Sequence, residues 1–274
     1  MNRSITFLLL LTCFLSACAP APEKYTNLES RSIDVTNAQP IFIQVDHGEV
    51  TLLASDDSRV SIDGQVLFAD KLEYQVNTTQ DQIVIKVFAH RDDLLSPPLR
   101  LFVHVPKQLQ VKVETDKASV LVQRYQGNLE VDSISGNITV EQMSGGLTAY
   151  SNRGNISVRD SSGEISIVGN YGALTMQNTS GETSASTIMG NILFDGLIQA
   201  GDKVRLEADH GSVSVNMTAD SALGIQVRST SGDVTCILPG VSSTTRTCDG
   251  TINSGSASLS IRTVSGAVTL QLMP

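Results

Sequence analysis

A glycine recurs every nine residues through the second half of the chain. Apolar residues stand two and four places after each of these glycines, in fifteen of sixteen positions, and Thr183 is the exception. Apolar side chains at every second position turn one face of a strand toward a core and the other toward solvent. Each unit is therefore predicted to be a short strand that follows a glycine-containing turn. Eight glycines keep the spacing without interruption: Gly127, Gly136, Gly145, Gly154, Gly163, Gly172, Gly181 and Gly190.

The same unit returns at wider spacing around Gly211, Gly232, Gly255 and Gly266, and once near the start, around Gly48. Short strands of this kind make either an antiparallel meander or a solenoid. The identical phase of successive units favours the solenoid, because stacked coils bring equivalent positions into register. The predicted fold is all-β, a parallel β-helix-like solenoid. One nine-residue unit is too short to enclose a core, so two or three units are expected in each coil.

The section from 33 to 116 is rich in predicted strands but has no regular period. Ile41–Val45 and Leu101–Pro106 are examples of its longer strands. A solenoid must protect the open end of its stack from edge pairing, so this section is expected to cap the solenoid. Residues 117–274 are expected to form the regular solenoid, and both sections are interpreted as one continuous domain from residue 33.

The N-terminus has the pattern of an export signal. Arg3 precedes an apolar run from Ile5 to Leu15, which is short for a membrane-spanning helix and typical of a signal peptide over residues 1–17. The residues Leu15-Ser16-Ala17-Cys18 resemble the lipobox of bacterial lipoproteins. This resemblance implies lipidation of Cys18, with residues 18–32 as the lipidated tether. An ordinary signal peptide followed by an unrelated cysteine is the alternative.

A lipid on Cys18 would make the membrane a partner of the protein. Acyl chains contribute about 0.8 kcal/mol for each buried methylene, which is enough to hold a protein without a spanning helix. Ala19 follows the cysteine, and by resemblance to sorted lipoproteins the absence of Asp there favours the outer membrane of a Gram-negative cell. The expected location is therefore the cell envelope.

The remaining cysteines fit an exported protein. Cys13 lies in the signal peptide and Cys18 in the lipobox, so Cys236 and Cys248 are left as a pair and are predicted to form a disulfide. Two free thiols or half of a zinc site are the alternatives, although no CxxC motif or histidine pair supports a metal.

The charge of the chain disfavours nucleic acid as a partner. The whole sequence has 19 basic and 28 acidic side chains, and removal of residues 1–17 takes away only Arg3. The mature chain then has 18 basic against 28 acidic side chains, a formal charge of −10. A protein that binds the phosphate backbone of a nucleic acid usually carries a positive charge on its binding surface.

Several units share the pattern Ser-Gly-x-Ile-x-Val or a close variant. They are Ser135–Val140, Ser162–Ile167 and Ser231–Cys236, and a preceding strand ends at Val105-Pro106. In these residues the chain resembles the bacterial adhesin-like domains of unknown function that are related to the auto-transporter adhesin head domain. The resemblance covers roughly residues 33–272. It implies a parallel β-helix-like fold on an envelope protein.

The outward-facing positions are where a binding surface is expected. Six consecutive units carry a hydroxyl three residues after the glycine, and such a ladder could bind a glycan or another ordered polar surface. The alternative is that Ser and Thr are simply well suited to exposed strands. If alternate units share a face, three of these hydroxyls lie on each side. The six are Thr139, Thr148, Ser157, Ser166, Thr175 and Ser184.

No catalytic or metal-binding constellation is evident. Glu130, Glu164 and Glu182 fall in different columns or distant units, so no pair of carboxylates is positioned for acid–base chemistry. The four histidines show no ligand spacing, and the aspartate of calcium-binding nonapeptide repeats is missing. No metal or cofactor is expected, and the predicted function is a non-enzymatic binding or structural, adhesin-like module. The alternatives are a glycan-active lyase or hydrolase on a β-helix, or a scaffold for another envelope protein.

Overall fold

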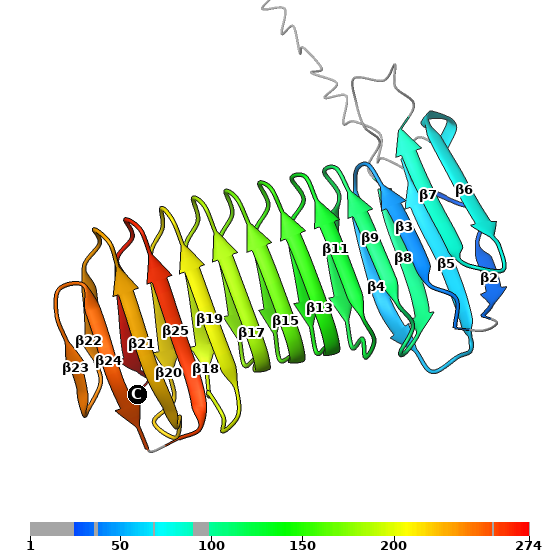
Figure 1. Ribbon diagram of the computed structural model, residues 1–274. Helices are drawn as coiled ribbons and strands as arrows, with labels where there is room; N and C mark the ends of the chain where they lie inside the picture. Colours follow the sequence, from blue (N-terminus) through cyan, green and yellow to red (C-terminus); the bar gives the residue numbers. More distant parts are fainter. Residues whose placement is uncertain (1–24, 36–37, 68, 90–98, 254, 274) are drawn as a thin grey trace, which may run out of the picture.

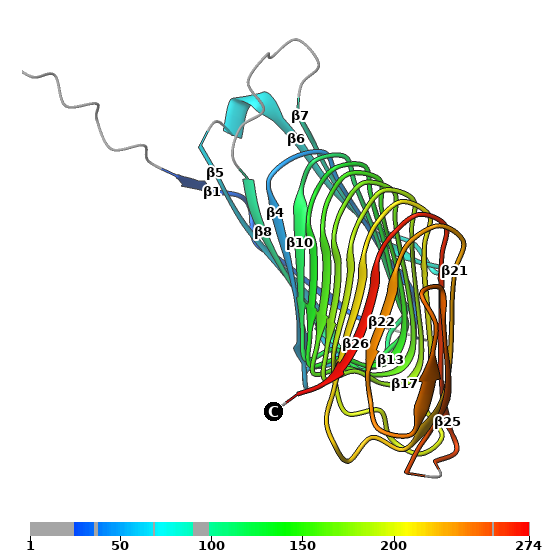
Figure 2. The same cartoon turned by 90° about the vertical axis from the view of Figure 1, so that its left-hand side faces the viewer.

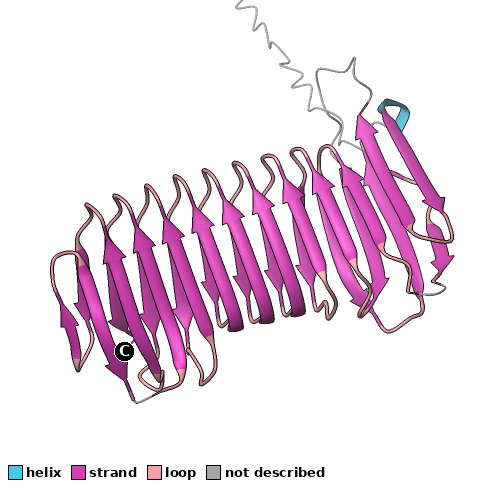
Figure 3. Ribbon diagram, in the orientation of Figure 1, coloured by secondary structure: helices cyan, strands magenta, loops and turns pink. Residues whose placement is uncertain are grey.

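The computed structural model of the chain describes residues 25–35, 38–67, 69–89, 99–253 and 255–273. Nearly all of the regular structure in these ranges is β-strand, and a single 3-10 turn, η1 (Ala69–Lys71), interrupts it. Two sheets of thirteen strands face each other along an elongated body (Figures 1 and 3). The predicted all-β solenoid is confirmed.

The first sheet, here called sheet A, contains the second strand of each coil. Its order across the sheet is β1 (Thr26–Asn27), β5 (Arg59–Val66), β8 (Leu99–Pro106), β4 (Glu49–Ser55), β10 (Ser119–Gln123), β12 (Ile138–Glu141), β14 (Ile156–Arg159), β16 (Leu174–Gln177), β18 (Ile192–Gly196), β20 (Val213–Met217), β26 (Val268–Leu272) and β22 (Val234–Ile237), with β2 (Arg31–Asp34) also paired to β5.

The second sheet, sheet B, contains the first strand of each coil. Its order, starting from the same end of the molecule, is β6 (Leu72–Thr78), β7 (Ile83–Ala89), β3 (Ile41–Val45), β9 (Val111–Thr115), β11 (Leu129–Ser133), β13 (Ser144–Ser151), β15 (Ser162–Gly169), β17 (Ser180–Thr187), β19 (Lys203–Ala208), β25 (Ala257–Thr263), β21 (Leu223–Ser229), β24 (Thr247–Ile252) and β23 (Val241–Ser243).

Two nine-residue units make one coil of eighteen residues. The parallel register shows this directly, because Ile138 lies beside Ile156 and Ile156 beside Leu174 in sheet A, while Leu147 lies beside Ile165 in sheet B. The chain thus alternates between the two sheets, and a view close to the long axis shows the coils stacked behind one another (Figure 2). The sequence had left two or three units per coil open.

The core is the narrow space between the two sheets. All sixteen side chains at the two repeat positions after the glycines are at most 2% exposed, including the polar Thr183. The core is mainly aliphatic, and each strand of the regular coils contributes two or three buried residues to it. Tyr125 and Phe194 are its largest fully buried members.

The glycine spacing has two separate causes. At the turns from sheet B to sheet A, a Cβ atom on Gly154 would lie 1.9 Å from the carbonyl oxygen of Gly136 in the coil before, so a side chain at this position would clash with the neighbouring coil. At the turns from A to B, Gly163 has a φ of +120°, which a side chain rarely permits. The hydroxyl of Ser151 accepts the N–H of Gly154 at 2.8 Å and closes the turn.

The two ends of the stack differ from its middle. The coil β7–β8 lies outside the earlier coil β3–β4, and the antiparallel strands β5 and β6 cover it. At the other end the last coil of the chain, β25–β26, lies between β19–β20 and β21–β22. The section 33–116 therefore contains two complete coils in addition to the cap.

The expected tether over residues 18–32 is too long. Thr26–Asn27 and Arg31–Asp34 pair antiparallel with β5 and belong to the cap, because this edge of sheet A offers unpaired backbone groups. The signal peptide (residues 1–17) and Cys18 lie outside the described residues.

Candidate functional site

The six expected hydroxyls form two ladders on opposite faces of the solenoid. Two units per coil place every second unit in the same sheet, so neighbours in a ladder are eighteen residues apart. The hydroxyl oxygen of Ser157 is buried and has no hydrogen-bond partner in the part of the chain that the structure describes. The ladder on sheet A is Thr139, Ser157 and Thr175, and the ladder on sheet B is Thr148, Ser166 and Ser184.

On sheet A, polar neighbours of the ladder bond to the next coil. The side-chain oxygen of Asn137 accepts the backbone N–H of Asn155 at 2.9 Å, and that of Asn155 accepts the N–H of Ala173 at 2.9 Å. On the other side of the ladder, Gln123 donates to Glu141 at 2.9 Å. These groups are occupied by the solenoid itself, which leaves few free for a ligand.

On sheet B, a second outward-facing column lies two residues before the hydroxyls in the sequence. In this column Gly146 has no side chain. Asn128 lies on one side of this glycine and Glu164 on the other. Gly146 does not have a positive φ, so its backbone conformation does not require glycine. The missing side chain leaves a shallow pocket of about 300 Å³. Its polar lining consists of Gln110, Asn128, Glu130, Thr148, Glu164 and Ser166.

One lysine pairs with three carboxylates beside the pocket. Lys112 lies 2.8 Å from Glu130, 3.2 Å from Glu114 and 3.4 Å from Asp132. Hydrogen bonds to Glu130 and Glu114 hold the pKa of Lys112 above its usual value, whereas burial raises the pKa of Asp132. Glu164 has no ion pair or hydrogen bond among the described residues. Its carboxylate is therefore free to accept hydrogen bonds at the pocket.

Two of the repeat carboxylates are closer than the sequence indicated. Glu164 and Glu182 occupy the same column of sheet B on adjacent coils. The expectation that they lie in different columns or distant units is wrong, because units two apart become neighbours when a coil holds two units. Lys203 lies 3.5 Å from Glu182 and partly offsets the repulsion between the two carboxylates.

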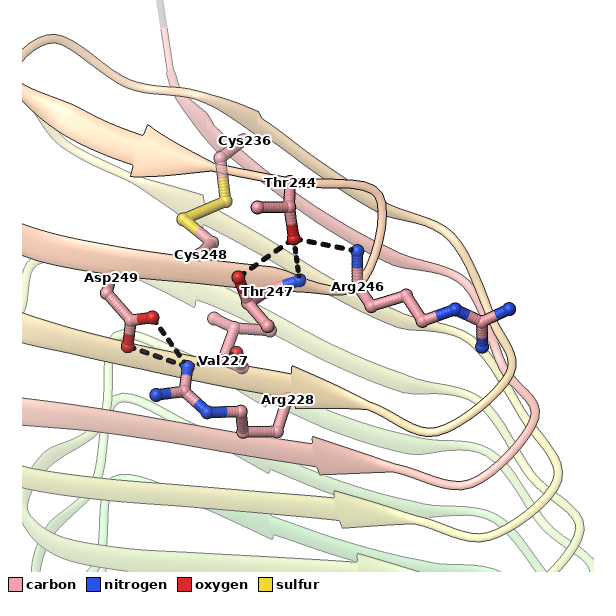
Figure 4. A network of polar contacts seen from close by, with 8 residues as sticks. All are labelled: Val227, Arg228, Cys236, Thr244, Arg246, Thr247, Cys248 and Asp249. Carbon is pink, nitrogen blue, oxygen red and sulfur yellow. Dashed lines mark hydrogen bonds and ion pairs between the residues drawn. A yellow bond between two sulfur atoms is a disulfide. The ribbon is translucent and has the colours of Figure 1, made fainter.

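The pair Cys236 and Cys248 forms a disulfide at the C-terminal end of the stack. Cys236 lies in β22 of sheet A and Cys248 in β24 of sheet B, so the bond joins the two sheets across the end of the core (Figure 4). Beside it, Arg228 and Asp249 pair at 2.7 Å between β21 and β24. The disulfide and this ion pair connect the strands at the C-terminal end of the stack.

No group of three or more His, Cys, Asp or Glu side chains in the described ranges is arranged to hold a metal ion. Within the same ranges, no helix has the length and apolar character needed to cross a membrane.

The repeat pattern did not predict the pocket, because the pocket depends on a second glycine that the pattern does not contain. Most units have one glycine at the turn, but Gly145 is followed by Gly146. This second glycine is the signal that could have identified the pocket. Its effect on the surface becomes visible only when the column Asn128, Gly146 and Glu164 is assembled from three coils.

The chain is similar to solved structures and to a described family. The chain is similar in structure to a protein described as a "putative adhesin" from Bacteroides fragilis NCTC 9343, with 11% identity over 91% of this chain and 98% of that chain and a TM-score of 0.54. A "putative adhesin" from Parabacteroides distasonis ATCC 8503 is 11% identical over 91% and 98% of the two chains, with a TM-score of 0.41. No curated protein matches. The family described as Toastrack DUF4097 matches residues 30–271, and the chain belongs to this family.

Proposed function

We propose that this protein is a lipoprotein of the cell envelope whose solenoid binds a glycan and catalyses no reaction. Cys18 carries the lipid and fixes the N-terminal end to the outer membrane. The name "putative adhesin" of the structural neighbour from Bacteroides fragilis supports a binding role of this kind. The surface that we assign to the glycan is the pocket at Gly146 together with the ladder Thr148, Ser166 and Ser184 on sheet B.

The pocket at Gly146 is the observation that carries the proposal. Sugar hydroxyl groups donate hydrogen bonds to carboxylates and amide oxygens, and they accept them from hydroxyl and amide donors. The pocket offers the free carboxylate of Glu164, the amides of Gln110 and Asn128, and the hydroxyls of Thr148 and Ser166. A few placed polar groups around a concave surface are what a site needs to orient a small ligand.

Filling the pocket tests the assignment. Gly146→Gln should lower affinity at least tenfold, because the new side chain occupies the space that the sugar needs. A Cβ atom at this position meets only the flexible amide of Asn128, at 2.8 Å, so the fold should tolerate it. Ala173→Gln is the matched control, since Ala173 holds the equivalent outward position on sheet A and is exposed.

The measurement uses the full chain on an array of bacterial envelope oligosaccharides, followed by biolayer interferometry with the best binder. Loss of binding in Gly146→Gln with retention in Ala173→Gln supports the proposal. Absence of any binder in the array, or equal loss in both variants, contradicts the glycan assignment. Turnover of a bound oligosaccharide would contradict the non-enzymatic role.

The anchor is tested separately. Cys18→Ser should shift the protein from the membrane fraction to the soluble fraction and abolish incorporation of radiolabelled palmitate. Cys13→Ser is the control, because residue 13 precedes the lipobox cleavage site and should leave both readouts unchanged. Unchanged membrane retention of Cys18→Ser would rule out this mode of attachment.

A further inference from the structure

Exposed apolar side chains gather on one long edge of the solenoid. Seven large apolar residues of the described chain are exposed, and six of them lie at or beside the turns that lead from sheet B to sheet A. These turns form the upper row in Figure 1. The six are Ile134 (54% exposed), Val168 (36%), Tyr171 (57%), Ile188 (46%), Met189 (54%) and Val264 (39%).

Backbone hydrogen bonds hold six successive turns of this row in register. The N–H of Arg153 donates to Ile134 at 3.1 Å, that of Tyr171 to Asn152 at 3.0 Å, and that of Met189 to Asn170 at 2.8 Å. The series continues from His210 to Ile188 at 2.7 Å and from Ser265 to Asp209 at 3.0 Å. The row is therefore a rigid strip with a step of roughly 4.8 Å from turn to turn.

In these six turns the side chains are ordered symmetrically about the point between the turn of Tyr171 and the turn of Met189. The two central turns carry Tyr171 on one side of the midpoint and Ile188 with Met189 on the other. The next turn outward carries Arg153 on one side and Asp209 with His210 on the other. The turns one step further out carry Ile134 on one side and Val264 on the other, and both are exposed. The row continues beyond them, to the turn of Asp116 before Ile134 and to the turn of Ser231 after Val264.

We propose that this row is the interface of an antiparallel homodimer, with the two-fold axis lying in the interface at the midpoint of the six turns. The rotation places Tyr171 against the partner's Met189 and Ile134 against the partner's Val264. It also brings Arg153 to the level of the partner's Asp209. In an isologous interface of this kind, each contact occurs twice, once on each side of the two-fold axis.

Charge favours a second copy in this orientation. Neither the guanidinium of Arg153 nor the carboxylate of Asp209 forms an ion pair within the described residues, so both are available to a partner. The antiparallel arrangement joins opposite charges at two symmetric positions. A parallel arrangement would place Arg153 level with the partner's Arg153 and is disfavoured.

The interface is long and narrow. Five steps between the turn of Ile134 and the turn of Val264 give a contact about 24 Å in length. Such a strip lies at the low end of interface sizes, so the dimer should be weak and concentration-dependent.

The two N-terminal ends of the pair point in opposite directions. The dimer depends neither on the glycan site on sheet B nor on the lipid at Cys18, so its failure leaves the proposed function untouched.

Cross-linking of the full chain tests the orientation. Tyr171→Cys should give a covalent dimer with a bifunctional maleimide of about 10 Å reach, since each residue 171 lies about one 4.8 Å step along the row from its counterpart. Ser135→Cys, on the turn of Ile134, should give none, because its counterpart lies about 24 Å away. Cross-linking at residue 135 would indicate a parallel pair and overturn the proposal. No dimer at residue 171 above the parent level, or a cross-link to a different protein, would overturn it as well.

Charge reversal tests the contact itself. In the Tyr171→Cys chain, Arg153→Glu or Asp209→Arg should each lower the yield of cross-linked dimer at least fivefold. The two changes together should restore most of it, which a merely local disturbance would not do. Arg159→Glu is the control, because Arg159 lies on the same coil but faces outward from sheet A and is exposed. Equal loss in the control, or no recovery in the double variant, refutes the pairing.

Discussion

The middle of the solenoid and its two ends are built by different rules. Between β9 and β18, coils that follow one another in the sequence bond to each other at a constant offset of eighteen residues. At the ends, coils stack out of sequence order and antiparallel strands cover the edges. The repeat thus makes a stack that could continue indefinitely, whereas the ends are specialised to stop it.

Deleting a coil should have opposite consequences in the two regions. Removal of residues 145–162 joins Ser144 to Gly163 and lets β15 take the place of β13, so the shortened chain should fold. Removal of residues 255–273 takes away β25 and β26, which bond to β19 and β20 on one side and to β21 and β22 on the other. Hydrogen exchange should then show loss of protection over residues 203–252 only in the second variant.

Equal protection in both deletion variants would contradict this distinction. It would mean that β21 and β22 slide onto β19 and β20 and rebuild a sequential end. The comparison between middle and ends would then describe the assembled chain but not its stability.

Glycine substitution should separate the stacked turns from the ends. Gly154→Ala places a Cβ atom 1.9 Å from the carbonyl oxygen of Gly136, a backbone atom that cannot rotate away. We expect a loss of roughly 3 kcal/mol or more in the free energy of unfolding. In Gly224→Ala the nearest atom is 4.0 Å away, so the change should cost less than about 1 kcal/mol. Urea denaturation followed by circular dichroism measures the free energy of unfolding of both variants. Similar losses in the two would show that close stacking of the turns is not the cause.

Reducing the disulfide should weaken only the C-terminal end. The bond closes a loop with a sequence separation of 12 residues, and its loss should cost about 2 to 3 kcal/mol. Because the cap is attached at one end of the stack, exchange should rise in β21–β24 and stay unchanged in β13–β17. Intact mass after alkylation should differ by two labelled thiols between reduced and untreated protein. No such difference would mean that the two cysteines are not bonded.

The smallest expected effect lies in the middle coils. Thr183 takes the place of an apolar residue between Ile165 and Val204, and its buried hydroxyl has no partner among the described residues. Thr183→Val keeps the shape and removes this hydroxyl, so stability should rise by up to about 1 kcal/mol. Ser184 faces outward, so Ser184→Ala should change the stability by less than about 0.5 kcal/mol. A fall in melting temperature for Thr183→Val would show that the hydroxyl is satisfied after all.

Much of the fold was predictable because the residues that form each strand recur at a constant spacing, and this spacing also determines how the coils stack. Residues such as Ile138 and Val140 show the strand period directly, and the constant phase indicated stacking. The ends were less predictable, since Thr26–Asn27 carries no repeat and joins the cap only because β5 offers a free edge. For the candidate site, the hydroxyl ladders followed from the sequence, but the pocket at Gly146 did not.

The sequence by itself determined the strand, its inward and outward faces and the turns, because each depends on residues within one nine-residue unit. Only the tertiary structure decided how many units close a coil, because that depends on the width of a core that two facing sheets share. It also decided that Glu164 and Glu182 are neighbours and that six exposed apolar side chains fall on one edge. These relations join residues eighteen or more positions apart, and the coil must close before they exist.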